Sequence, residues 1–287
     1  MNIKQSLIWA IKILQKSKSF SPSLDAEILL AFALKKPKKF LCAHFEKKLT
    51  AAQFSKFKKL IARRAKHEPV AYITGQKYFY GLNFFIDKNV LIPRPETETL
   101  VEEILKSKIV NHKSAIIDVG TGSGAIAVSL AKNLPNSKIF ATEISKKALT
   151  VAKKNAHQNK AKITFLHGNL FEPFLKSKIK NLKSLTIVAN LPYLATRQWQ
   201  KTQPEIKKYE PRQALDGGTD GLKYYREILQ QIELLATNHP LSITSLFEID
   251  PSQKNPITKL IKRRFPVAKI EIKKDLAGRD RVVVFKI

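Results

Sequence analysis

Hydrophobic side chains recur every three or four residues across residues 1–75, as they do along one face of a helix. The clearest series are Leu7, Ile8, Ile11 and Leu14; Leu24, Ile28, Leu29 and Phe32; and Phe54, Phe57 and Ile61. Ser21 before Pro22 resembles a helix cap followed by a first-turn proline, and Thr50 with Gln53 forms a capping-box signal. Residues 1–75 therefore predict a small helical domain.

The pattern changes twice after this domain. Residues 76–93 are rich in aromatic and β-branched side chains around Gly81 and Asn83, which predicts a β-hairpin connector. Across residues 94–287, strand-like runs such as AIIDV and KIFATEI alternate with helical patterns, which predicts an α/β domain with a doubly wound, mostly parallel sheet. The last stretch reads as two strands joined by a turn at Gly278, so the sheet should end in an antiparallel pair.

Composition narrows the class of protein. A hydrophobic fraction of 44% and a charged fraction of 26% are ordinary for a globular protein, and no apolar run approaches the length of a membrane span. The single cysteine, Cys42, excludes an internal disulfide and a cysteine metal cluster, which favours the cytoplasm. The six histidines have no metal-ligand spacing, so we expect no metal.

The net charge of +29 raises the question of a nucleic-acid partner, because a basic surface attracts polyanions. Only ten of the 52 basic residues are arginine, the better reader of phosphates and bases, and the lysines run through every segment. We therefore interpret the charge as a solvated surface with at most a weak attraction to nucleic acid or the ribosome.

A glycine-rich loop follows the first predicted strand of the α/β domain. AIIDV runs into residues 120–124 and then into a helix, so backbone amides of the loop are expected to face a ligand. Glu143 ends the next strand about twenty residues later, where a carboxylate can accept hydrogen bonds from ribose hydroxyls. The two features predict a nucleotide-type cofactor. The loop alone leaves its identity open, because Gly120, Gly122 and Ala125 also satisfy the dinucleotide pattern.

The strand LTIVA ends at Asn190, Leu191, Pro192 and Tyr193, at the sheet edge where open α/β proteins bind ligands. The side-chain oxygen of Asn190 and the carbonyl of Leu191 would accept the two N–H bonds of a planar nitrogen and present it to an electrophilic methyl group. Pro192 would stiffen the loop, and Tyr193 would offer a flat face to the substrate or a sulfonium cation. The alternative is a plain strand-end turn with a core tyrosine.

These motifs resemble those of the release factor glutamine methyltransferases of the HemK/PrmC type. IIDVGTGSGAIAVSLA resembles the family's cofactor motif, ANLPY stands where the family carries Asn-Pro-Pro-Tyr, and YEPRQALDGGTDGL resembles the segment after it. Residues 63–102, RRAKHEPVAYITGQKYFYGLNF followed by VLIPRPETETLVE, are similar to the family's domain junction. Related enzymes that act on a large-subunit ribosomal protein tend to read Ile-Pro-Arg-Ser-Pro where this chain has Pro95 and Glu96.

The resemblance implies a Rossmann-like class I methyltransferase that uses S-adenosylmethionine to methylate the glutamine of the Gly-Gly-Gln motif in peptide chain release factors. The cofactor contacts that it implies are Gly120, Thr121, Gly122, Ser123, Gly124, Glu143, Asn169, Leu170 and Asn190. The substrate amide would be held by Asn190, Leu191, Pro192 and Tyr193. Residues 1–75 would recognise the substrate protein, and we expect a cytoplasmic monomer without membrane contact.

Three positions depart from the family's usual pattern. Glu143 and Asn169 stand where Asp is commoner, and both keep an oxygen acceptor. Leu191 replaces the first proline of the clamp, which keeps the carbonyl but loosens the backbone. Asn-Leu-Pro-Tyr is similar to the motif of the ribosomal RNA adenine dimethyltransferases, so adenine N6-methylation of ribosomal RNA is an alternative. Those enzymes usually carry their extra domain after the catalytic one and lack the Arg94–Glu98 junction.

Three classes thus remain at this point: a protein glutamine methyltransferase, acting on release factors or alternatively on a ribosomal protein; an RNA adenine methyltransferase; and a catalytically idle ribosome-associated binder that kept the fold. Two further groups of residues carry expectations of their own. Glu96 and Glu98 would help to close the cofactor pocket or would lie at a solvated helix start. Gly217, Gly218 and Gly221 would let a lid fold over the glutamine or would form simple turns.

Overall fold

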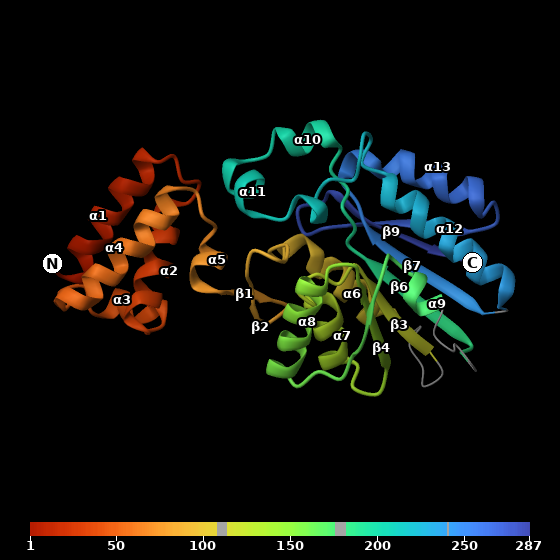
Figure 1. The fold of residues 1–287 in the computed structure, drawn as a ribbon, viewed down its shortest axis with the longest axis horizontal. Coiled ribbons are helices and arrows are strands. Elements are labelled where there is room, and N and C mark those ends of the chain that lie inside the picture. The colour runs from red at the N-terminus through yellow and green to blue at the C-terminus, as the bar shows by residue number, and fades with distance from the viewer. Residues whose placement is uncertain (108–113, 176–181, 240) are drawn as a thin grey trace. The chain divides into compact units, whose positions relative to one another are not determined.

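The computed structural model describes residues 1–107, 114–175, 182–239 and 241–287 (Figure 1). The chain forms two compact units, and each is made of two stretches of sequence. The first unit is Met1–Gln76 with Gln203–Tyr209, and the second is Lys77–Thr202 with Glu210–Ile287. The boundaries expected from the sequence do not anticipate that a short segment from the second half of the chain groups with the helical unit.

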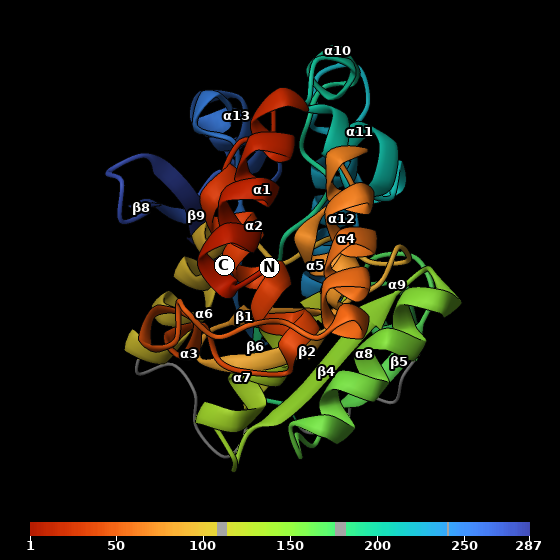
Figure 2. The ribbon, with the colours of Figure 1, turned by 90° about the vertical axis from the view of Figure 1, so that its left-hand side faces the viewer.

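The first unit consists of helices that enclose their own core (Figures 1 and 2). They are α1 (Ile3–Lys16), α2 (Pro22–Leu34), α3 (Lys38–Ala43), α4 (Ala51–Ala65), α5 (Val70–Thr74) and, from the later segment, α11 (Pro204–Tyr209). Leu14, Leu29 and Phe57 are fully buried where α1, α2 and α4 pack together. The buried face of α1 differs from the expected one, since Ile8 is 47% exposed and Ala10 is buried in its place.

Capping explains where the longer helices of this unit begin. The predicted box at the start of α4 is present, because Thr50 accepts a hydrogen bond from the Gln53 amide and the Gln53 side chain accepts one from the Thr50 amide. Asn2 and Gln5 form the same arrangement at α1. Ser21 precedes α2 as expected, but its side chain makes no capping hydrogen bond.

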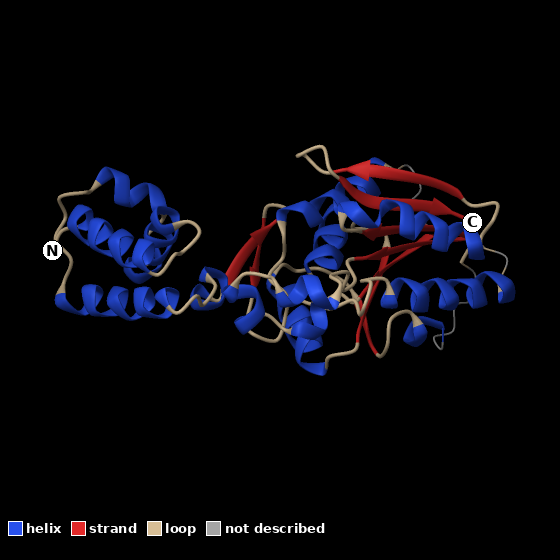
Figure 3. Ribbon diagram, turned by 90° about the horizontal axis from the view of Figure 1, so that it is seen from above, coloured by secondary structure: helices blue, strands red, loops and turns tan. Residues whose placement is uncertain are grey.

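A seven-stranded sheet organises the second unit, in the order β5-β4-β3-β6-β7-β9-β8 (strands in red, Figure 3). Its strands are β3 (Ser114–Val119), β4 (Lys138–Glu143), β5 (Thr164–His167), β6 (Ser184–Ala189), β7 (Ser242–Glu248), β8 (Lys269–Lys274) and β9 (Asp280–Lys286). The first five are parallel, and β9 pairs antiparallel with β7 and β8. This confirms the predicted doubly wound, mostly parallel sheet and its antiparallel end.

Helices cover both faces of this sheet (Figure 1). They are α6 (Glu98–Lys106), α7 (Ala125–Asn133), α8 (Lys146–Gln158), α9 (Glu172–Leu175), α12 (Lys223–Asn238) and α13 (Lys254–Arg264), while α10 (Thr196–Gln200) lies in the segment between β6 and α11. Short 3₁₀ turns lie at Pro95–Thr97, Arg212–Ala214 and Pro251–Gln253. The expected hairpin is formed by β1 (Gln76–Phe79) and β2 (Leu82–Phe85). Alternate residues of β3 and β6 join a core with α12 and α13. Among the described residues, no helix is both long and apolar enough to cross a membrane.

The order of the strands determines where in the sheet the site lies. β3 pairs with β4 on one side and with β6 on the other, and the register sets Val119 beside both Thr142 and Ala189. The loops that follow β3, β4 and β6 therefore leave the same edge of the sheet side by side. This is the carboxyl edge of an open α/β sheet at the point where the strand order reverses, the usual place for a ligand.

Candidate active site

A cavity of about 640 Å³ opens at this edge, and all the residues that line it belong to the second unit. Its size is in the range of small-molecule sites. Eight of the residues predicted from the sequence line it: Gly120, Gly122, Glu143, Asn169, Leu170, Asn190, Leu191 and Pro192. Further lining residues come from the segments Asn89–Leu91 and Pro211–Ala214 and from the start of α12. The glycine loop and the Asn-Leu-Pro-Tyr segment thus share one cavity.

Three loop residues that were expected to contact the cofactor do not line the cavity. They determine the shape of the loop instead. Thr121 and Ser123 are buried, and Gly124 is the N-cap residue of α7 with a left-handed backbone, φ +82°. The Thr121 hydroxyl donates to Asp118 Oδ2 at 2.6 Å. These residues would act on a cofactor only through the position of Gly120 and Gly122.

The structure corrects the expectation that the backbone amides of the glycine-rich loop face a ligand. The amides of Gly120 and Thr121 both donate to the Thr142 carbonyl, that of Gly122 donates to Glu143, and that of Gly124 donates to the Thr121 carbonyl. These four amides donate to acceptors inside the protein and so are not free to bind a ligand. A pyrophosphate needs such amides as donors, so the loop is poorly suited to a dinucleotide.

Glu143 is positioned by the loop that it supports. Its two carboxylate oxygens accept hydrogen bonds from the amides of Gly122 and Ser145, at 2.9 and 2.8 Å, and the side chain lines the cavity. Each oxygen has a second lone pair, so the carboxylate can still accept from ribose hydroxyls. Among the described residues, the charged ones that line the cavity are Glu143, Glu227 and Lys223, so the lining has a formal net charge of −1. This lining suits a cationic nucleoside better than a polyphosphate.

Asp118 is a buried carboxyl that joins β3 to the loop and to α7. It accepts hydrogen bonds from the Thr121 hydroxyl and from the Ala127 amide, at 2.6 and 3.2 Å. Burial raises the pKa of Asp118 to about 7, with a further increase from the charge of Glu143, although both hydrogen bonds lower it. The motif IIDVGTGSG contains this residue, but its role does not follow from sequence spacing.

Asn155 on α8 is a second residue that sequence patterns did not single out. Its side chain accepts from the Phe85 amide at 2.7 Å and donates to the carbonyls of Phe85 and Ser123, at 2.9 and 2.8 Å. It therefore continues the hydrogen bonding of the hairpin strand β2 and at the same time fixes the glycine loop. In the sequence Asn155 is only an asparagine inside a helical pattern, and its complete burial becomes visible in the structure.

Two oxygen acceptors at the end of β6 are available to a substrate. The Asn190 side chain donates from Nδ2 to the Thr97 hydroxyl at 3.0 Å, and among the described residues its Oδ1 accepts no hydrogen bond. The same holds for the carbonyl oxygen of Leu191, whose side chain is buried in the core. The Leu191 side chain lies about 3.6 Å from where a Cβ on Gly120 would be, so the two loops are in contact.

Tyr193 has a different place from the one expected for a substrate platform. It does not line the cavity; its ring packs against the core and its hydroxyl donates to Glu248 Oε1 at 3.2 Å. Burial raises the pKa of Tyr193, and the charge of Glu248 raises it further. The structure agrees with the alternative interpretation, a core tyrosine that holds the strand end.

Gly217 and Gly221 lie against the backbone of the loop that contains Pro192 and Tyr193. A Cβ on Gly217 would lie 2.5 Å from the Pro192 carbonyl oxygen, and one on Gly221 would lie 2.2 Å from that of Tyr193. Gln253 donates to the carbonyls of Tyr193 and Gly221, at 2.9 and 3.2 Å. These glycines permit a close approach of two backbones, a role beyond that of a simple turn.

Glu96 and Glu98 do not line the cavity, so the expectation that they close it is wrong. Glu98 accepts a hydrogen bond from the Tyr80 amide at 2.8 Å and thereby attaches the hairpin to the start of α6. Glu96 is exposed in the 3₁₀ turn before α6.

Comparison with known proteins agrees with this geometry. The family description "Methyltransferase small domain" matches residues 95–206, and the catalytic domain of hMettl16 solved with the MAT2A 3'UTR hairpin 6 has the same fold. That structure is 18% identical, with a TM-score of 0.53, over 79% of this chain and 81% of its own. The sheet, the loop and the cavity thus define a methyltransferase domain.

The helical unit and the full-length relatives narrow the class further. "PrmC N-terminal domain" matches residues 5–75. The release factor glutamine methyltransferase of Bacillus anthracis is 34% identical over the whole of both chains, and that of Thermodesulfovibrio yellowstonii is 42% identical over 83% of each. This chain belongs to the release factor glutamine methyltransferase family.

Proposed function

We propose that the protein transfers a methyl group from S-adenosylmethionine to the side-chain amide nitrogen of the glutamine in the Gly-Gly-Gln motif of peptide chain release factors. One observation carries this proposal beyond family membership. Asn190 and Leu191 line the same cavity as Gly120 and Glu143. Among the described residues, neither Asn190 Oδ1 nor the Leu191 carbonyl oxygen accepts a hydrogen bond from the protein.

The cavity residues fit the cofactor. Glu143 would accept hydrogen bonds from the ribose, and Gly120, Gly122, Asn169 and Leu170 would form the walls around the nucleoside. When bound, S-adenosylmethionine supplies an electrophilic methyl group and a positive charge. The negative sum of the lining charges favours that charge, and the cofactor has no phosphate that would require the loop amides.

The clamp residues would overcome the low reactivity of an amide nitrogen. Its lone pair is delocalised into the carbonyl, so the nitrogen must be held at the reacting carbon with its N–H bonds engaged. Asn190 Oδ1 and the Leu191 carbonyl would accept these two N–H bonds and stabilise the positive charge that develops on the nitrogen. The methylated nitrogen is strongly acidic and releases its proton to water, so no strong general base is required. Pro192 would stiffen the loop, and Tyr193 would hold it through Glu248.

The rest of the molecule has a role in the same proposal. Residues 1–75 would recognise the release factor, and residues 94–287 would carry out the methyl transfer. Residues 76–93 would connect these two domains. We place this activity in the cytoplasm, in a monomer. The net charge of +29 would add a weak, salt-dependent attraction to the ribosome.

Labelled S-adenosylmethionine tests the proposal against its alternatives. The chain is incubated separately with a release factor, with the same factor carrying Gly-Gly-Glu in place of Gly-Gly-Gln, with ribosomal RNA and with ribosomal proteins. We expect label in the first sample alone, because the glutamate variant has no amide nitrogen. Label in RNA or in a ribosomal protein, with none in the release factor, would refute the assigned substrate.

A further inference from the structure

The side chains of Asn190 and Tyr193, at the end of β6, both lead to one buried carboxylate, Glu248. Glu248 ends β7, the strand next to β6, and it is 1% exposed. It accepts a hydrogen bond from the Tyr193 hydroxyl at 3.2 Å, and its own backbone carbonyl accepts one from the Tyr225 hydroxyl. Glu248 does not line the cavity, so it would influence the reaction only through other residues.

Thr97 forms the link from Glu248 to Asn190. It ends the 3₁₀ turn Pro95–Thr97 and is 4% exposed. Its oxygen accepts the hydrogen bond from Asn190 Nδ2 at 3.0 Å, and its hydroxyl lies close enough to Glu248 to lower the pKa of that carboxyl. Thr97 thus stands between the clamp amide and the buried carboxylate.

The donors and acceptors of this chain of contacts have one consistent direction. An ionised carboxylate only accepts, so the Tyr193 hydroxyl donates its proton to Glu248, and the nearby Thr97 hydroxyl would donate toward the same carboxyl. The oxygen of Thr97 is then left to accept, which selects the nitrogen of Asn190 as its partner. The oxygen of Asn190 is then turned away from Thr97, and Asn190 lines the cavity. In the flipped orientation, two oxygen atoms would face each other at Thr97 and the amide NH₂ would meet the N–H bonds of the substrate.

We propose that Glu248 and Thr97 are positioning residues that fix the amide orientation of Asn190, so that its oxygen faces the substrate nitrogen. This inference rests on the proposed function, because it assigns the clamp to Asn190. It explains why a charged side chain is retained under the strand ends, where burial without a purpose is costly.

The surroundings of Glu248 make its charge sensitive to pH. Burial raises its pKa to about 7, and Glu96 in the 3₁₀ turn raises it further, while Arg281 on β9 and the two hydroxyls lower it. Arg281 is itself bound by Asp275 at 3.1 Å. Among the described residues, Glu248 Oε2 has no hydrogen-bond partner. A proton taken up there could be donated to Thr97, which would remove the preference for one orientation of Asn190.

The test compares Thr97→Val, which keeps the shape without the hydroxyl, with Thr97→Ser, which keeps the hydroxyl. We expect Thr97→Val to lower kcat roughly 10-fold or more, with KM for the release factor and cofactor affinity nearly unchanged, and Thr97→Ser to restore most of kcat. In an Asn190→Ala background, Thr97→Val should cause no further loss, because the amide that it orients is absent. Cofactor binding confirms that each variant is folded.

The pH profile supplies a second readout. We expect kcat of the wild type to fall as pH decreases through about 7, where Glu248 becomes protonated, and Glu248→Gln to lose this dependence. Wild-type kcat in Thr97→Val would overturn the inference, and so would losses that simply add to those of Asn190→Ala. If Asn190→Ala itself keeps full turnover, the clamp proposal fails first, and the two failures are thereby distinguished.

Discussion

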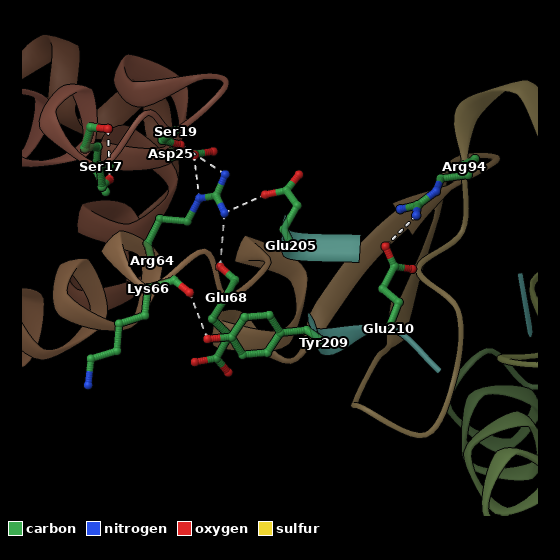
Figure 4. A network of polar contacts seen from close by, with 11 residues as sticks. Ser17, Ser19, Asp25, Arg64, Lys66, Glu68, Arg94, Glu205, Tyr209 and Glu210 are labelled. Carbon is green, nitrogen blue, oxygen red and sulfur yellow. Dashed lines mark hydrogen bonds and ion pairs between the residues drawn. The ribbon is translucent and has the colours of Figure 1, made fainter. Parts of the chain in front are cut away.

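The guanidinium of Arg94 donates to Glu210 Oε1 at 2.5 Å, across 116 residues of sequence (Figure 4). Glu210 is buried, and its second oxygen accepts a hydrogen bond from the Ile92 amide at 3.2 Å. The segments on either side of this pair, Asn89–Leu91 and Pro211–Ala214, both line the cavity. The pair therefore holds together two walls of the site that come from distant parts of the chain.

Removal of this pair should loosen the cavity. We expect Glu210→Ala to lower the free energy of unfolding by about 1.5–3 kcal/mol, since it leaves Arg94 and the Ile92 amide without their acceptor. Glu210→Gln should cost less, because its amide oxygen can still accept from Ile92. Urea unfolding and calorimetric cofactor binding measure both effects. Asp220→Asn, in an exposed pair with Arg226, is the control and should change stability by less than about 1 kcal/mol.

Asn190→Ala separates binding from chemistry. We expect cofactor affinity to change little, because Glu143 and the glycine loop remain, while turnover falls roughly 100-fold or more with the loss of one acceptor at the nitrogen. Single-turnover kinetics with a release factor and titration with the cofactor provide the two values. Turnover equal to that of the wild type would exclude Asn190 from the mechanism.

Gly221→Ala tests the support behind the clamp. Its backbone has φ +76°, and a Cβ would lie 2.2 Å from the Tyr193 carbonyl oxygen and 2.7 Å from Gln253 Nε2. Gly278→Ala is a matched control, because φ is +75° there but a Cβ would meet nothing within 4 Å. Both variants should lose about 1–2 kcal/mol of stability from the left-handed backbone, and Gly221→Ala should lose more because two backbones must move apart. Only Gly221→Ala should also lose most of its methyl transfer, and equal activities in the two variants would contradict this role.

The pKa of Asp118, raised from 3.8 to about 7, predicts a pH dependence of stability. Between these values the folded state binds a proton that the unfolded state has released, so this contribution is complete below about pH 4 and is lost as pH rises through 7. One proton limits the slope to about 1.4 kcal/mol per pH unit. Asp118→Asn should therefore gain stability relative to the wild type as pH rises from 4 to 8. Parallel unfolding curves for the two proteins at all pH values would argue against a raised pKa.

Arg64 should be essential to the stability of the helical unit. It is 4% exposed and binds Asp25 at 2.7 Å, Glu205 at 2.6 Å and the Ser19 hydroxyl at 3.0 Å (Figure 4). We expect Arg64→Met to lower the free energy of unfolding of this unit by about 3–5 kcal/mol, because it leaves the buried carboxylate of Asp25 without its cationic partner and with only the Ser19 hydroxyl as a donor. The neighbouring Arg63→Ala breaks an exposed pair with Glu68 and should cost less than about 1 kcal/mol. Hydrogen exchange in α2 and α11 reports the difference.

Sequence patterns predicted those features that depend on nearby residues. Strands buried on both faces appear as short apolar runs, so the sheet and its antiparallel end followed from AIIDV, LTIVA and the final twenty residues. The cavity walls at Gly120, Glu143 and Asn190 followed as well, since ligands bind where parallel strands end. The buried face of α1 was placed less well, because hydrophobic spacing alone does not distinguish Ile8 from Ala10 as the residue that fits the core.

The remaining features depend on contacts between distant residues. Thr97 meets Asn190 across 93 residues, and Asn155 meets Phe85 across 70. The sequence around a polar residue in a helix or turn does not predict its hydrogen-bond partner, because that partner depends on how the strands are arranged. The loop amides were assigned to a ligand for the same reason, since their acceptor, the Thr142 carbonyl, belongs to a neighbouring strand whose register the sequence does not reveal.

The assignment of α11 to the helical unit has a consequence for truncation. Glu205 binds Arg64, and the Tyr209 hydroxyl donates to the Lys66 carbonyl at 3.0 Å, only one residue before Glu210 joins the other unit. A fragment that starts after residue 76 would keep α11 but lose both of these partners. The amino-terminal unit therefore cannot be removed by a single cut in the chain. Such a cut would leave α11 without its packing partners, and the chain continues directly from α11 into the cavity wall at Pro211–Ala214.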